Sequence, residues 1–261
     1  MKIGIFDSGL GGLIITKAIS EFLPEYDYVY FGDTKRLPYG NKSHDEVSEF
    51  TREAVDYLFR RENCAIVVIA CNTASSRALR QIQQEYLPAN FPDRKVIGVL
   101  IPASEVASTY EKVGVLATIG TVASNAFQIE INKLNPNTQV FQNPAPELVP
   151  MIENGDLSKA EPLLIEYLEP FMDKNLDALV LGCTHYPMLK QEIGKIMGPK
   201  VQIISQEEII PQKFKDYLVR HPEIENKLSR DANIKILVTK PTENMTDLVK
   251  KWFGKMGINI I

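Results

Sequence analysis

The sequence KIGIFDS at residues 2–8 is similar to KVGVLAT at residues 112–118, which lies 110 residues later. A second pair of similar stretches, IACNT at 69–73 and LGCTH at 181–185, lies 112 residues apart. Each stretch contains a short apolar run that stops at polar residues, which is typical of a buried strand that ends in a turn. Two features that recur at nearly the same offset predict two similar halves, the second beginning near residue 99.

Short apolar runs alternate with longer amphipathic stretches along the chain. All-apolar strands separated by helices are typical of parallel sheets covered on both faces. Two capping boxes support helix starts, Ser43 with Glu46 and Ser158 with Glu161. We therefore predict an α/β protein with two similar domains, mainly parallel sheets and a pseudo-twofold relation between them. The nine expected strands lie near residues 3–6, 28–31, 65–70, 96–100, 113–117, 139–142, 178–181, 201–204 and 234–238.

The composition is that of an ordinary globular protein. The 261 residues are 44% hydrophobic and 24% charged, with 29 Lys and Arg against 33 Asp and Glu and a net charge of −4. A chain of this length buries most of its surface without the help of disulfides or metals. The mild acidity argues against a nucleic-acid partner, because proteins that bind nucleic acids usually show a basic face.

The apolar stretches are far shorter than the ~20 residues that span a bilayer. Asp7 ends the first apolar run before a signal-peptide core is complete. We therefore expect a cytoplasmic protein without a membrane partner. The three cysteines form no CxxC pair, and an odd number suits free thiols in a reducing compartment. With only three histidines in the chain, no metal site is expected.

Two of the cysteines, Cys71 and Cys183, lie at matching positions in the two halves. Each follows a predicted strand and precedes a predicted helix, which is where ligands bind in open α/β sheets. The helix dipole at that place is expected to stabilise a thiolate and lower the pKa of the thiol. Cys64 opens a strand, has no such counterpart and is expected to be inert.

Two thiols that face each other across a cleft suit the inversion of a carbon centre. One base must remove a proton from one face of the carbon, and a separate acid must deliver a proton to the other face. Halves related by a pseudo-twofold axis place one sulfur on each side. The repeat therefore favours a racemase or epimerase with its active site in the cleft between the halves.

Four motifs resemble those of the glutamate racemases, in the cofactor-independent aspartate/glutamate racemase superfamily: FDSGLGG at 6–12, DTKRLPYG at 33–40, ACNTAS at 70–75 and LGCTHYP at 181–187. The resemblance covers nearly the whole chain. It implies interconversion of L- and D-glutamate without pyridoxal phosphate, and a supply of D-glutamate for peptidoglycan synthesis. It also implies that the C-terminal tail belongs to the first domain. The first domain is then residues 1–98 together with 206–261, and the second domain is residues 99–205.

The resemblance also implies roles for individual residues. It makes Cys71 and Cys183 the two acid–base catalysts, with Asp7 beside the first and His185 beside the second. Glu153 matches an acidic residue that the family often keeps near the second cysteine; the alternative is a solvated helix carboxylate. Pairs of residues in the same motifs bind the amino acid: Asp7 and Ser8, Tyr39 and Gly40, Asn72 and Thr73, and Thr184 and His185.

Short polar groups dominate this predicted site. A Lys or Arg would clamp one substrate carboxylate but would also hold both thiols ionised. Thr118 is the counterpart of Ser8 in the repeat, so we expect its hydroxyl in the cleft, with Thr121 beside it at a helix start. Four further residues offer hydroxyl, amide or backbone N–H donors that suit carboxylates: Ser8, Asn72, Thr73 and Thr184.

Three stretches depart from the pattern usual in the family. They are IPA at 101–103 in place of Glu-Pro-Gly, NPAP at 143–146 where Cys-Pro is common, and SQEE at 205–208 in place of Ser-Gly-Ala-Glu. The departures concern the hinge and the pocket wall and leave both cysteine motifs intact. Aspartate, or a broader range of acidic amino acids, is therefore the alternative substrate.

A nucleotide-binding α/β module is the alternative outside the racemases. The run GLGG at 9–12 and Asp33 after the second strand resemble parts of a dinucleotide-binding fingerprint, but Ile14 stands where its third glycine belongs. That alternative leaves both cysteine motifs unexplained. A homodimer, and an added role in binding a protein such as gyrase, stay open.

Overall fold

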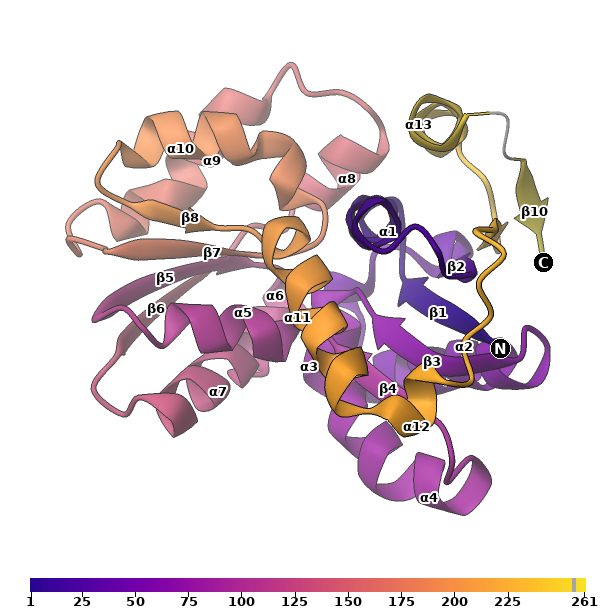
Figure 1. The fold of residues 1–261 in the computed structure, drawn as a ribbon. Coiled ribbons are helices and arrows are strands. Elements are labelled where there is room, and N and C mark those ends of the chain that lie inside the picture. The colour runs from indigo at the N-terminus through magenta and orange to yellow at the C-terminus, as the bar shows by residue number, and fades with distance from the viewer. Residues whose placement is uncertain (255–256) are drawn as a thin grey trace.

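The chain folds into two parallel β-sheets, each flanked by helices (Figure 1). The computed structural model describes residues 1–254 and 257–261. A six-stranded sheet has the order β10-β9-β2-β1-β3-β4, and a four-stranded sheet has the order β6-β5-β7-β8. Neighbouring strands run parallel in both sheets.

The strands of the first sheet are β1 (Lys2–Asp7), β2 (Tyr28–Gly32), β3 (Cys64–Ile69), β4 (Lys95–Gly98), β9 (Ile234–Val238) and β10 (Ile258–Ile260). Those of the second are β5 (Lys112–Ala117), β6 (Gln139–Pro144), β7 (Ala178–Gly182) and β8 (Gln202–Ile204). The helices are α1 (Gly11–Phe22), α2 (His44–Arg60), α3 (Asn72–Gln81), α4 (Leu87–Asn90), α5 (Leu100–Ala107), α6 (Ile119–Ala123), α7 (Ala126–Leu134), α8 (Leu148–Glu153), α9 (Ala160–Leu168), α10 (Lys190–Met197), α11 (Gln206–Arg220), α12 (Pro222–Glu225) and α13 (Glu243–Phe253). Shorter helical turns cover Thr34–Arg36, Tyr39–Asn41, Ile82–Tyr86, Glu169–Phe171 and Tyr186–Leu189.

The two sheets share one topology. In the first, β1 lies between β2 and β3, and β4 follows on the far side of β3. In the second, β5 lies between β6 and β7, and β8 follows on the far side of β7. The repeated sequences form β1 and β5, and Cys71 and Cys183 come just after β3 and β7. The prediction of an α/β protein with two similar parallel sheets is confirmed.

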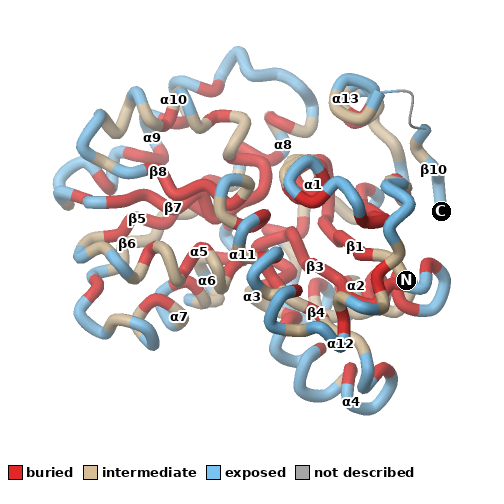
Figure 2. The backbone as a smooth tube through the Cα atoms, in the orientation of Figure 1, coloured by how far each residue is buried: buried red, intermediate tan, exposed pale blue. Residues whose placement is uncertain are grey.

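The central strands are buried because their side chains alternate between two layers of helices (Figure 2). In β1, Ile3 and Ile5 belong to the core cluster that includes α1, whereas Phe6 belongs to the cluster beneath α2 and α3. The cluster that includes α1 continues into the second sheet through Leu179 and Leu181 of β7. One continuous apolar core therefore joins the two halves.

Most of the sequence predictions about secondary structure are confirmed. All nine expected strands are present, with ends within two residues of the expected ones. The capping box of Ser43 and Glu46 opens α2. The prediction of a capping box at Ser158 and Glu161 is wrong. Both the hydroxyl and the N–H of Ser158 donate to Asp156, and α9 begins only at Ala160. The short edge strand β10 was not expected.

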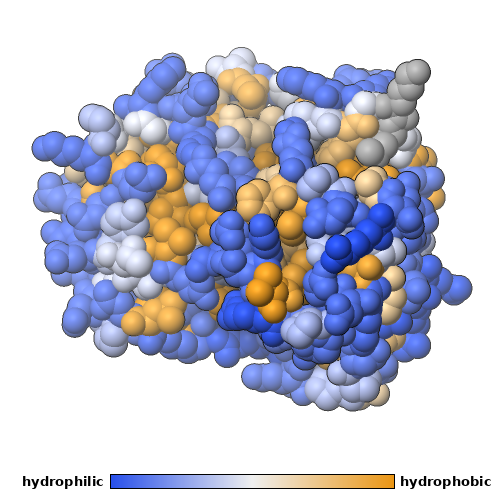
Figure 3. Space-filling view, in the orientation of Figure 1, coloured by the Kyte–Doolittle hydropathy of each residue, from blue (hydrophilic) through white to orange (hydrophobic). Residues whose placement is uncertain are grey.

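The surface is mostly hydrophilic on the face drawn in Figure 3, and hydrophobic residues show near the boundary between the two sheets. The long helix α11 crosses this boundary in Figure 1 and packs on both α1 and α5. Within residues 1–254 and 257–261, no helix combines the length and the apolar character needed to cross a membrane.

Gly12 allows α1 to lie directly on the end of β1. A Cβ atom at this position would overlap Cβ of Asp7 and lie 2.9 Å from Cε2 of Tyr30. Overpacking of this kind typically costs about 1 to 3 kcal/mol. We therefore expect Gly12→Ala to lower the free energy of unfolding in urea by that amount. The control is Gly194→Ala in α10, where the nearest atom is 3.9 Å away; it is expected to be neutral or stabilising by up to about 1 kcal/mol. Equal effects of the two substitutions would contradict the close approach.

Candidate active site

A small cavity lies where the carboxyl ends of the central strands of the two sheets meet. Its volume is about 20 Å³, which is room for little more than one water molecule. This volume is smaller than an amino acid. The residues that line the cavity are Ser8, Pro38, Tyr39, Gly40, Asn41, Cys71, Asn72, Thr73, Thr118, Pro146, Val149, Cys183, Thr184 and His185.

The structure brings ten of the predicted site residues together at this cavity, including both cysteines. Asp7, Glu153 and Thr121 lie behind the lining and contact it through hydrogen bonds. Sequence reasoning missed Pro38, Asn41, Pro146 and Val149 as lining residues. Nothing in their residue types marks them as functional, since apolar and turn residues occur throughout the chain.

Cys71 is the N-cap residue of α3, and its sulfur accepts a hydrogen bond from the N–H of Ala74 at 3.5 Å. The hydroxyl of Ser8 lies 3.5 Å from the same sulfur. The expected lowering of its pKa is nevertheless wrong. Burial and the nearby charge of Asp7 raise the pKa of the Cys71 thiol to about 12, and the two hydrogen bonds only partly offset this. Burial in this site therefore favours the protonated thiol of Cys71.

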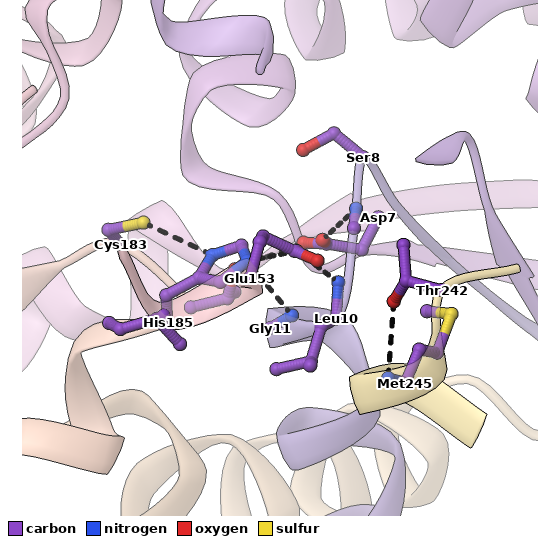
Figure 4. Close-up of polar contacts among 12 residues, drawn as sticks. Asp7, Ser8, Leu10, Gly11, Glu153, Cys183, His185, Thr242 and Met245 are labelled. Carbon is purple, nitrogen blue, oxygen red and sulfur yellow. Dashed lines mark hydrogen bonds and ion pairs between the residues drawn. The ribbon is translucent and has the colours of Figure 1, made fainter. Parts of the chain in front are cut away.

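Cys183 has a histidine and a carboxylate behind it (Figure 4). Its sulfur lies 3.6 Å from Nδ1 of His185, and Nε2 of His185 lies 2.6 Å from Oε1 of Glu153. Burial by itself lowers the pKa of His185, but hydrogen bonds to Cys183 and Glu153 outweigh it and hold that pKa well above its usual value. The second oxygen of Glu153, Oε2, is buried without a hydrogen-bond partner in the described part of the chain. Among the described residues, Glu153 therefore makes its side-chain hydrogen bonds through Oε1.

The start of α1 contacts this histidine–carboxylate pair. The backbone N–H of Leu10 donates to Oε1 of Glu153 at 2.6 Å, and the N–H of Gly11 lies 3.3 Å from Nε2 of His185. A Cβ atom at Gly11 would lie 2.8 Å from the backbone carbon of Thr184. The glycine run at 9–12 therefore serves close packing, and its N–H groups contact protein side chains. This arrangement argues against the nucleotide-binding alternative.

Asp7 is fully buried at the end of β1. Its carboxylate accepts hydrogen bonds from the N–H of Gly9 at 2.7 Å and from the hydroxyl of Thr184 at 3.1 Å. Burial raises the pKa of Asp7 to about 6, although His185 and these hydrogen bonds act in the opposite direction. A carboxyl group with such a pKa exchanges protons near neutral pH and lies between the two cysteine motifs.

Three threonine hydroxyls join the two halves at the other side of the cavity. Oγ1 of Thr73, after β3, lies 2.8 Å from Oγ1 of Thr118 and 3.3 Å from Oγ1 of Thr121, both after β5. Thr118 caps α6 by accepting from the N–H of Thr121. Gly40 lies against Thr118, since a Cβ there would be 2.8 Å from Cβ of Thr118. These hydroxyls are available to a carboxylate once the halves separate.

Tyr39 presents its ring to the cavity while its hydroxyl points away from it. The hydroxyl donates to Oδ2 of Asp33 at 2.6 Å, and Oδ1 of Asp33 accepts from the hydroxyl of Thr239 at 3.1 Å. Nη1 of Arg36 lies 3.4 Å from the same carboxylate. Asp33 therefore supports the cavity wall instead of contacting a ribose.

Gln206 is a further residue that sequence reasoning missed. Its side-chain amide pairs with that of Asn72, which lies 134 residues earlier in the chain. The sequence offered no signal for this pair beyond the unusual SQEE stretch, because neither residue belongs to a pattern that links distant segments.

A second cavity of about 340 Å³ lies between α3, α5 and α11. None of the predicted site residues lines it. In residues 1–254 and 257–261, no three His, Cys, Asp or Glu residues are grouped so that they could hold a metal ion. The smaller cavity is therefore the candidate active site.

The chain is similar in sequence to known racemases. A family model described as Asp/Glu/hydantoin racemase matches residues 9–210. Glutamate racemase 1 of Caldanaerobacter subterraneus subsp. tengcongensis is 37% identical over 264 residues, which cover 99% of this chain and 95% of the relative.

Two solved structures are similar over the whole chain. The glutamate racemase of Francisella tularensis in complex with D-glutamate has a TM-score of 0.88 at 34% identity, covering 100% of this chain and 97% of that one. The glutamate racemase of Thermus thermophilus in complex with β-chloro-D-alanine has a TM-score of 0.83 at 34% identity, covering 100% and 96%.

The raised pKa of Asp7 predicts that this residue destabilises the folded protein above pH 6. The folded state binds the proton more tightly than the unfolded state, so its stability falls as the pH rises from 3.8 to about 6. Two units of pKa correspond to about 3 kcal/mol. We expect the free energy of unfolding of Asp7→Asn, relative to the wild type, to increase by about that amount between pH 4 and pH 8 in urea titrations.

The same substitution at the exposed Asp231 controls for the loss of one carboxylate elsewhere. If the difference between Asp7→Asn and the wild type stayed constant over this pH range, the buried carboxyl group would not have the raised pKa.

Proposed function

The chain belongs to the Asp/Glu/hydantoin racemase family, and we propose that it interconverts L- and D-glutamate by proton transfer between Cα and two cysteines. One observation carries the proposal. Cys71 and Cys183 come from equivalent strand ends of two similar sheets and line the same cavity. Two sulfurs so placed provide an acid and a base for opposite faces of one carbon.

The surroundings of the two sulfurs differ, which supports different starting roles. Nδ1 of His185, whose pKa is held well above its usual value, lies 3.6 Å from the sulfur of Cys183. Cys71 has no cation beside it in the described residues and holds its proton. For L-glutamate, Cys183 takes the Cα proton as the Cα–H bond breaks and an S–H bond forms. Cys71 then gives its own proton to the opposite face, and D-glutamate results.

The reverse reaction uses the same groups with their roles exchanged. Cys71 removes the proton from D-glutamate, and Cys183 delivers one to form L-glutamate. Asp7, with a pKa of about 6, is the group that we propose to accept the proton of Cys71, although its charge raises the Cys71 pKa once it is ionised. Glu153 keeps His185 charged and oriented, so both act through the cysteine next to them. The proposed reaction uses no cofactor and no metal.

The lining suits a substrate with two carboxylates. It offers the hydroxyls of Ser8, Thr73, Thr118 and Thr184 and the amide of Asn72, and none of the residues that line the cavity is a Lys or Arg. Hydroxyl and amide donors bind carboxylates without fixing a permanent positive charge beside the thiols. Similar proteins are named glutamate racemases, one of them with D-glutamate bound, which supports glutamate over aspartate.

Three wider proposals follow from this activity. The domains are residues 1–98 with 206–261, and residues 99–205, so that the cavity lies between them. The D-glutamate formed supplies peptidoglycan synthesis. The compartment is the cytoplasm, since Cys64, Cys71 and Cys183 are all free thiols, which suits a reducing environment.

Deuterium exchange tests the reaction and the substrate together. In D2O without added cofactor, we expect the protein to incorporate deuterium at Cα of L-glutamate and to form D-glutamate, because each solvent-exchanged thiol returns a deuteron. L-Aspartate serves as the matched comparison, and mass spectrometry with chiral chromatography measures both. Exchange on L-aspartate at an equal rate would replace the proposal by a broader racemase. Absence of exchange on both substrates would refute it.

Single substitutions test the two cysteines separately. Serine has a far higher pKa than cysteine and is a poor base at neutral pH. We therefore expect Cys71→Ser and Cys183→Ser each to lower racemisation by a factor of about 100 or more. The control is Cys64→Ser, because Cys64 is buried inside β3 away from the cavity; it should change the rate little.

A chlorinated glutamate analogue that loses chloride distinguishes the two faces, since elimination needs only the base. Cys71→Ser is expected to process the L-analogue and Cys183→Ser the D-analogue. If both variants preferred the same enantiomer, or if Cys64→Ser were equally damaging, the assignment of the two sulfurs to opposite faces would be wrong.

A further inference from the structure

Gln206 and Asn72 form a buried amide pair behind the active site. Nδ2 of Asn72 donates to Oε1 of Gln206 at 2.7 Å, and Nε2 of Gln206 donates to Oδ1 of Asn72 at 2.8 Å. Only 1% of Gln206 and 2% of Asn72 are exposed. Asn72 lines the cavity and Gln206 does not. Gln206 therefore contacts the site only through other residues.

A third hydrogen bond decides which way both amides face. Nε2 of Gln206 also donates to the backbone carbonyl of Val99 at 3.2 Å. An amide that pairs reciprocally with another can rotate by 180° together with its partner and keep both bonds. Here that rotation would turn Oε1 of Gln206 toward the carbonyl oxygen of Val99, and two acceptors would face each other without a proton. The backbone carbonyl thus fixes Gln206, and Gln206 fixes Asn72.

The fixed orientation leaves one hydrogen of the Asn72 amide without a partner in the described part of the chain. Nδ2 carries two hydrogens, of which one binds Gln206. Asn72 lines the cavity next to Cys71, so the proposal assigns its second hydrogen to the substrate. With the amide reversed, Oδ1 would take this place and repel a carboxylate. The orientation therefore decides whether Asn72 attracts or repels an acidic substrate.

We infer that Gln206 is a positioning residue that holds the Asn72 amide with its N–H toward the substrate carboxylate. This inference rests on the proposed glutamate racemase function. Gln206 begins α11 just after β8, and Val99 lies between β4 and α5. These are the two places where the chain passes between the sheets. The orientation of Asn72 is therefore set by the connections between the halves.

Gln206→Met tests the inference, because methionine has a similar size but cannot form the three hydrogen bonds. We expect the KM for glutamate to rise about tenfold, equivalent to about 1.4 kcal/mol, while kcat changes less than about twofold. The control is Glu208→Gln in the same turn of α11, an exposed residue whose contact is Lys190; it should keep the wild-type KM. Circular dichroism follows racemisation in both directions.

A double variant separates positioning from a general structural effect. In an Asn72→Ala background, Gln206→Met should leave KM within about twofold, because no amide remains to be oriented. A full tenfold effect in that background would overturn the inference. Gln206→Glu serves if the methionine variant does not fold: its side chain keeps the shape but has at most one proton for two acceptors, Oδ1 of Asn72 and the Val99 carbonyl. The same rise in KM is expected.

Different results would refute the racemase function and the positioning role of Gln206. A wild-type protein without deuterium exchange on glutamate would refute the racemase function. A wild type that racemises glutamate, together with an unchanged KM in the folded Gln206→Met and Gln206→Glu variants, would refute only the role of Gln206.

Discussion

The contact between the start of α1 and the Cys183 segment holds the active site together. The N–H of Leu10 donates to Glu153, which belongs to the second sheet's side of the cleft, and the backbone at Gly11 lies against Thr184. Only glycine at position 11 lets the two backbones come this close. The apolar core that includes α1 also continues into the second sheet, so close packing and the candidate site occur in the same region.

Burial of this region determines how the site is charged. In water, a carboxyl, a histidine and a thiol have pKa values near 4, 6.5 and 8.5. Here, burial raises the pKa of both Asp7 and Cys71, while Glu153 and Cys183 keep His185 charged. The two cysteines are equivalent by sequence but not by environment. The equivalent strands β3 and β7 are thus followed by two cysteines, Cys71 and Cys183, whose neighbouring charged groups differ.

The size of the cavity adds a constraint on the way the protein works. A volume of about 20 Å³ excludes an amino acid and nearly all water. The hydroxyls of Thr73, Thr118 and Thr121 satisfy one another across the cleft in this closed form. Because each hydroxyl both donates and accepts, these groups can bind water or a carboxylate as well as one another.

The sequence by itself determined the α/β class, nine of the ten strands in the described residues and the two cysteine motifs. Local patterns carry this information, since apolar runs form strands wherever they can be buried, and a repeat at a fixed offset predicts equivalent places in two sheets. The resemblance of the sequence motifs to those of the glutamate racemases also pointed to Asp7, Ser8, Thr184 and His185.

Only the tertiary structure decided the rest. It reversed the expected direction of the Cys71 pKa, because the helix N-terminus is a local feature and burial depends on the whole fold. It showed that Ser158 binds Asp156 instead of capping α9. It paired Gln206 with Asn72 across 134 residues and turned the Tyr39 hydroxyl toward Asp33. Such contacts join segments that are distant in the chain, and their geometry follows from how helices and sheets pack, which no local pattern of residues encodes.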